Sequence, residues 1–164
     1  MASDEATEVG PAVPADIDGI LEVQEENQPE HGGSLSARFP RTWFDRAIAE
    51  GWLVVARVHG RVAGYVAFTP QAAQLEVPVI RAMLAAHPEP AAYLHGPICV
   101  GRAYRRRGLA GAMFRAQREI MRGAPVLAFI REDNEASRRA HAGLGMHEAG
   151  TFEHGGVRFV VVAA

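Results

Sequence analysis

The first group of residues that could do chemistry is a cluster of arginines. The cluster consists of Arg102, Arg105, Arg106 and Arg107. It lies between the apolar run 98–100 and Gly108, after which apolar residues recur at helical spacing. The first amides of a helix lack intrahelical partners and carry partial positive charge, glycine lets a ligand approach closely, and arginine offers forked donors. The pattern predicts that a phosphate group binds at the start of this helix.

The same segment resembles a family signature. Arg105-x-x-Gly108-x-Ala110 after a strand is similar to the Gln/Arg-x-x-Gly-x-Gly/Ala motif of the GNAT superfamily of N-acetyltransferases. The resemblance implies that acetyl-CoA (CoA) is the co-substrate and that its pyrophosphate lies on the arginine turn. The implied cofactor-binding residues here are Ile98, Cys99, Val100, Arg105, Arg106, Arg107, Gly108, Leu109 and Ala110. The alternative for the motif alone is an arginine-rich, solvated helix start.

A second segment resembles the other signature of the family. Asn134 can open a helix, Ser137 takes the usual small-residue position, and Gly145 stands near the close, with Met146 in place of phenylalanine. His141 occupies the position where the family commonly has tyrosine. The resemblance implies that Asn134 and Ser137 contact the cofactor, and that His141 donates a proton to the departing CoA thiolate. The alternatives are a plain helix cap and a packed histidine.

Other chemistries have weaker support in the residues. Cys99, the only cysteine, could be a covalent nucleophile, but it lies in an apolar strand without an adjacent acid–base partner. The seven histidines contain no tight ligand pair, so we expect no metal site. The net charge of −2, with Tyr104 as the only aromatic residue in the arginine cluster, argues against a nucleic-acid partner.

Periodicity and turn residues predict the elements that position these groups. Helices are expected over 16–28, 38–50, 77–86, 108–120 and 134–146, and strands over 52–58, 61–68, 93–100, 126–130, 147–153 and 157–162. His59-Gly60 predicts a hairpin, and Gly96-Pro97 predicts a bulge or splay. The resemblance implies an α+β (mixed α/β) GNAT-like fold. Its mixed, mostly antiparallel sheet is splayed between two central strands and flanked by helices on both faces.

Length and composition set the frame for this fold. With 164 residues, 48% hydrophobic and 22% charged, the chain fits one globular domain, which we place at 13–164 as the N-acetyltransferase domain. Residues 1–12 are predicted to be a flexible N-terminal tail. The single cysteine excludes an internal disulfide, and neither a membrane-length apolar run nor a signal pattern occurs. We therefore expect a cytoplasmic protein that does not bind membranes.

The expected activity is direct transfer of an acetyl group to a primary amine of a small molecule, an amino acid or a peptide. The alternative is a non-catalytic acyl-CoA-binding sensor or regulatory module, which needs the phosphate site but no proton donor. We expect acceptor specificity to lie in 27–38 and 69–92. A row of carboxylates is either a cation-attracting surface or a solvated helix face: Glu22, Glu25, Glu26 and Glu30. Both a monomer and a homodimer remain open.

Overall fold

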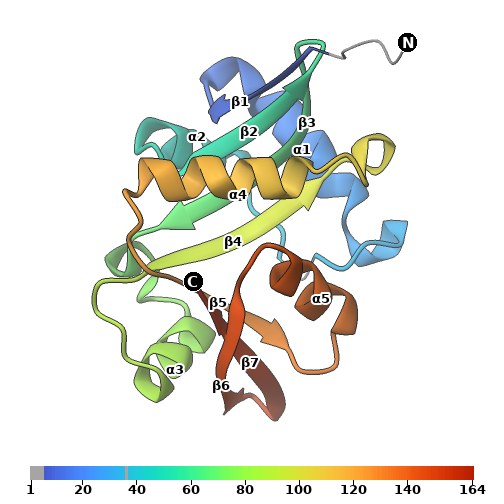
Figure 1. The fold of residues 1–164 in the computed structure, drawn as a ribbon. Helices are drawn as coiled ribbons and strands as arrows, with labels where there is room; N and C mark the ends of the chain where they lie inside the picture. Colours follow the sequence, from blue (N-terminus) through green and yellow to red (C-terminus); the bar gives the residue numbers. More distant parts are fainter. Residues whose placement is uncertain (1–5, 36) are drawn as a thin grey trace. The chain divides into compact units, whose positions relative to one another are not determined.

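The computed structural model describes residues 6–35 and 37–164 of the chain. Its strands are β1 (Thr7–Pro11), β2 (Leu53–Val58), β3 (Arg61–Thr69), β4 (Tyr93–Val100), β5 (Val126–Arg131), β6 (His147–His154) and β7 (Val157–Ala163). Its α helices are α1 (Ile17–Glu26), α2 (Arg41–Ala49), α3 (Pro78–Ala86), α4 (Leu109–Ile120) and α5 (Glu135–Gly143) (Figure 1). In these described ranges no helix is both long and apolar enough to cross a membrane.

The strands form a mixed, mostly antiparallel sheet, as predicted. Hydrogen bonding orders them β1-β2-β3-β4-β5-β7-β6, and β4 with β5 is a parallel pair. The β1–β2, β2–β3, β5–β7 and β6–β7 pairs are antiparallel. By contacts the chain divides into two compact units, Met1–Phe68 with Pro97–Met121, and Thr69–Gly96 with Arg122–Ala164.

In the first unit, helices cover both faces of the strands. Val54 and Val55 are neighbours that point to opposite faces of β2, and both are fully buried. Val55 belongs to a core with Ile20 of α1 and Phe44 of α2, whereas α4 contacts β1 and β2 (Figure 1). The near-continuous apolar sequence of β2 is therefore explained by cover on both sides, as expected.

In the second unit, α3 is a packing element. Ile80 and Met83, one helical turn apart, are buried against Leu127, Phe152 and Val161 of the strands. The sequence predicted this helix over 77–86. Its apolar stripe lies in the core because α3 packs along β6.

The prediction of a flexible tail over residues 1–12 is wrong for the segment that forms β1. Thr7–Pro11 form β1 and pair with β2 from Thr7↔Val58 to Pro11↔Val54, while residues 1–5 lie outside the described residues. β1 has a single neighbouring strand and is largely exposed, so it needs no apolar alternation, and Pro11 is tolerated at its end. α2 also begins later than expected, because Pro40 disfavours helical backbone at Phe39.

β4 carries the irregularity that Gly96-Pro97 predicts. Gly96 has a φ of +111°, a backbone conformation that L side chains rarely adopt. The parallel ladder between β4 and β5 consists of Tyr93↔Val126 and Leu94↔Leu127, two pairs in strands of eight and six residues. Pairing between β4 and β5 is therefore confined to the first residues of each strand.

Candidate functional site

The arginine turn has an unusual backbone. β4 ends at Val100, and a short 3-10 turn over Arg102–Tyr104 follows. Arg106 and Gly108 then both lie in the left-handed region, with φ of +63° and +75°. A left-handed arginine is strained, and such strain concentrates at ligand-binding sites. Gly108 is followed by the first backbone amides of α4, which lack intrahelical partners and can bind an anion.

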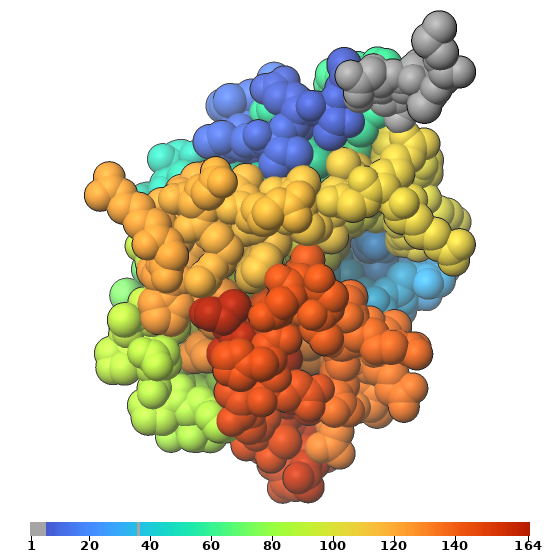
Figure 2. Space-filling view, in the orientation of Figure 1, coloured from blue at the N-terminus to red at the C-terminus, as the bar shows by residue number. Residues whose placement is uncertain are grey.

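The start of α4 has room for a phosphate. A Cβ built on Gly108, the N-cap residue, would meet no atom within 4 Å, so the space beside this backbone is open. The next residue, Leu109, is buried and anchors the helix. Arg105, Arg106 and Arg107 are exposed, and the surface of this segment is visible in yellow in Figure 2. The residues at this helix start therefore fit a phosphate group sterically and in charge.

The end of α1 holds the arginine turn. Glu26 Oε1 accepts the backbone N–H of Arg102 at 2.7 Å, so this carboxylate of the predicted row has a structural partner. Asn27 Oδ1 accepts a hydrogen bond from Arg105 Nη2 at 2.9 Å, and Asn27 Nδ2 donates to the Val100 carbonyl at 3.3 Å. No local sequence pattern points to Asn27 as a site residue, because these two partners lie more than 70 positions away.

Cys99 is unsuited to act as a nucleophile. Its side chain is 4% exposed and packs in the core of the first unit. Burial raises the pKa of this thiol to about 11, even though contact with Tyr65 and the charge of Arg105 act in the opposite direction. The thiol is therefore protonated at neutral pH, and the covalent alternative is wrong on this ground. Only its main chain can serve a ligand, and the flanking Ile98 and Val100 are half-buried.

α5 brings together three residues of the second motif. Asn134 is its N-cap and accepts the backbone N–H of Ser137 at 3.1 Å, which confirms the expected cap. The carbonyl of Ser137 lies 2.8 Å from Nδ1 of His141. The helical spacing thus aligns these residues along one side of the helix, as predicted.

The hydrogen bond to Ser137 determines the tautomer of His141. A carbonyl oxygen only accepts, so Nδ1 carries the proton and Nε2 of the neutral ring presents a lone pair. Burial lowers the pKa of His141, although the bond to Ser137 acts in the opposite direction, and the neutral ring is favoured. A proton donor was expected at this position, but neutral His141 already gives its one N–H to Ser137.

A second histidine lies beside His141 in the same unit. The ring of His95, on β4, meets that of His141 edge to face, with centroids 5.5 Å apart. His95 is 6% exposed. No sequence pattern predicted this pairing, because His95 belongs to neither motif.

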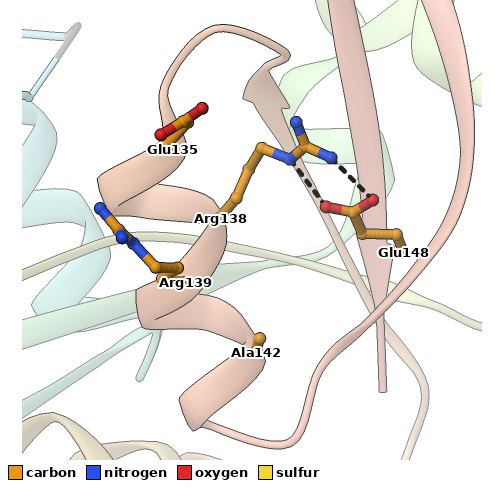
Figure 3. A pocket seen from close by; sticks show the side chains of 5 residues that line it. All are labelled: Glu135, Arg138, Arg139, Ala142 and Glu148. Atoms are coloured by element: carbon orange, nitrogen blue, oxygen red, sulfur yellow. Dashed lines mark hydrogen bonds and ion pairs between the residues drawn. The ribbon is translucent and has the colours of Figure 1, made fainter.

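A surface hollow on the second unit is spanned by an ion pair between Arg138 and Glu148. It has a volume of about 300 Å³ and is lined by Glu135, Arg138, Arg139, Ala142 and Glu148 (Figure 3). Arg138 reaches across it and pairs with both carboxylate oxygens of Glu148, at 2.7 and 3.0 Å. Arg138 also donates to the Glu132 carbonyl at 3.0 Å. Three N–H donors of Arg138 are therefore engaged by protein oxygens.

Three exposed groups in the first unit have metal-ligand spacing. The ligand atoms of Glu25, Glu30 and His31 lie within 4.8 Å of one another. Arg38 forms ion pairs with both carboxylates, at 3.0 Å to Glu25 and also to Glu30. The guanidinium already supplies the positive charge that these carboxylates attract, and the group is a surface ion-pair network.

Comparisons with known proteins agree with the motifs. Residues 20–146 match the sequence model of the family described as acetyltransferase (GNAT) family. A search of curated proteins found no match. Among solved structures, a GNAT-family acetyltransferase from Streptococcus agalactiae 2603 is 21% identical, with a TM-score of 0.70 over 96% of this chain and 94% of that one.

Two further solved structures are similar. One is the ribosomal-protein-S18-alanine N-acetyltransferase from Escherichia coli, 14% identical, with a TM-score of 0.65 over 96% of this chain and 92% of that chain. The other is yncA, a putative acetyltransferase from Salmonella typhimurium with its cofactor acetyl-CoA. It is 18% identical, with a TM-score of 0.66 over 97% and 93% of the two chains. At these identities the likeness shows the fold alone.

Proposed function

This chain belongs to the acetyltransferase (GNAT) family, and on that basis we propose that it transfers the acetyl group of acetyl-CoA directly to a primary amine. The acceptor class is an amine of a small molecule, an amino acid or a peptide. The single observation that carries the proposal is the helix start at Gly108, which combines an open backbone, a left-handed turn and exposed arginines.

In this proposal the first unit holds the cofactor's pyrophosphate. Helix amides after Gly108 and the guanidinium groups of Arg105, Arg106 and Arg107 supply donors to the phosphate oxygens. Main-chain groups of 98–100 bond the pantetheine arm, since the side chain of Cys99 is buried. Asn134 and Ser137 are assigned to the cofactor by their match to the second motif, beside their role in capping α5.

His141 is proposed to move the proton of the reaction. Acetyl-CoA supplies an acyl thioester, whose C–S bond breaks as the new C–N bond forms. The attacking amine must lose a proton and the departing thiolate gains one. Because Nδ1–H is held by Ser137, Nε2 of neutral His141 can take the proton from the amine and then return it to the thiolate sulfur. This role replaces the simple donor that the sequence analysis expected.

The test is a free-thiol assay with acetyl-CoA and a panel of amines that includes amino acids, polyamines, aminoglycosides and peptides. Thiol release that depends on an amine, with the acetylated amine identified by mass spectrometry, is the expected result. Calorimetric titration with CoA runs in parallel. CoA binding without turnover on any amine would favour the sensor or regulatory module, and no CoA binding would refute the proposal.

A further inference from the structure

We infer that Asn27, at the end of α1, is a positioning residue for the CoA-binding arginine Arg105, an inference that rests on the proposed function. The two residues are far apart in sequence, and both belong to the first unit. Asn27 itself belongs to neither family motif. Its role is to hold the guanidinium of Arg105 where a phosphate can use it.

The contacts of Asn27 leave its side chain little freedom. Nδ2 donates to the carbonyl of Val23 at 2.8 Å, within α1, and to that of Val100 at 3.3 Å, at the end of β4. With both amide hydrogens engaged, Oδ1 is oriented toward Arg105 Nη2, 2.9 Å away. The amide thus joins the helix end, the strand end and the arginine turn.

This bond matters because Arg105 is exposed. A long side chain that binds a ligand must give up its rotamer freedom, and a tether removes part of that cost in advance. The bond to Asn27 uses one of the five N–H donors of the guanidinium, which leaves donors for phosphate oxygens. Asn27 is neutral, so it orients the guanidinium without cancelling the positive charge that attracts phosphate.

The backbone of Asn27 is fixed from its other side. Its carbonyl accepts the N–H of Leu35 at 3.1 Å, which folds the following loop back on the helix end. Gly33 packs so closely there that a Cβ on it would lie 1.9 Å from the same carbonyl oxygen. The loop can close on Asn27 only with glycine at position 33, so the backbone of Asn27 is held in place from this side.

The experiment measures CoA affinity by calorimetry for wild type, Asn27→Ala, Arg105→Ala and the double variant. Asn27→Ala is expected to weaken CoA binding about threefold to tenfold, the cost of ordering one freed arginine side chain. In the Arg105→Ala background, the same change is expected to have no further effect, because the residue that it positions is gone. A simple sum of the two single effects in the double variant would overturn the inference.

Gln28→Ala is the matched control. Gln28 is the next residue, and its amide donates to the carbonyls of Gln24, in α1, and of Ala37. Among the described residues, no hydrogen bond joins this side chain to the arginine turn. Gln28→Ala should leave CoA affinity unchanged. If it weakened CoA binding as much as Asn27→Ala does, Asn27 would be a general loop contact, and the inference would be overturned. If circular dichroism shows that Asn27→Ala does not fold, Asn27→Ser, too short to reach Arg105, takes its place.

The wild-type titration distinguishes failure of the positioning role from failure of the proposed function. Normal CoA binding by wild type together with unchanged binding by the Asn27 variant would overturn the positioning role alone. No CoA binding by wild type would overturn the proposed function and this inference with it.

Discussion

Replacing Gly108 by alanine separates its role in folding from its role in binding. Gly108 has a φ of +75°, and a Cβ there would meet no protein atom within 4 Å. The cost to stability is therefore backbone strain alone, about 1 kcal/mol for an L residue in the left-handed region. For a chain of this size, that lowers the melting temperature by about 2–4 °C.

The cost to CoA binding should be larger, because the methyl group occupies the space through which a phosphate would reach the helix amides. Loss of one charge-assisted hydrogen bond amounts to about 1.5–3 kcal/mol, or a tenfold to hundredfold weaker affinity. Calorimetry with CoA gives the affinity, and thermal unfolding gives the stability.

Gly51 offers a matched control for this substitution. It also has a φ of +75°, is exposed, and would place a Cβ in open space, but it follows α2 away from the arginine turn. Gly51→Ala should lower the melting temperature by a similar amount and leave CoA affinity unchanged. If Gly108→Ala bound CoA as tightly as Gly51→Ala, the phosphate site at the start of α4 would be refuted.

The remaining predictions rest on contacts that each lie within a single unit. His141→Ala should lower turnover with little change in acetyl-CoA affinity. Because burial lowers the pKa of His141 below 6.5, wild-type turnover should fall as pH drops through that lowered value. The free energy of unfolding of wild type should also decrease as pH falls below 6.5, because His141 binds a proton more readily in the unfolded chain than in the folded one. A free energy of unfolding that does not change with pH in this range would contradict this. Gly64→Ala should lower the free energy of unfolding by about 1–3 kcal/mol in denaturant titrations, because the new Cβ would lie 2.8 Å from the backbone carbonyl oxygen of Cys99. Gly10→Ala, whose Cβ would meet no atom within 4 Å, should change it little. Arg57→Ala should cost about 3–5 kcal/mol at pH 7, because it leaves the carboxylate of Asp16 buried without its partner 2.6 Å away, and a loss under 1 kcal/mol would refute this.

The sequence alone determined the parts of the molecule whose causes are local. The hairpin at His59-Gly60, the helix start at Gly108 and the cap at Asn134 all follow from backbone preferences and hydrogen bonds between residues a few positions apart. The arginine turn was predictable for the same reason, because its charges and its glycine are neighbours in the chain. Two-sided cover of β2 was also readable from its unbroken apolar run.

Only the tertiary structure determined the contacts between distant segments. β1 pairs through main-chain groups, which leave no side-chain pattern, so its strand was mistaken for part of a tail. The bonds of Asn27 to Arg105 and the pairing of His95 with His141 likewise exist only because folding closes long loops. The tautomer of His141 was decided in the same way. Its residue type allows donation or acceptance, and the carbonyl of Ser137 together with burial selects the neutral ring with a free lone pair on Nε2.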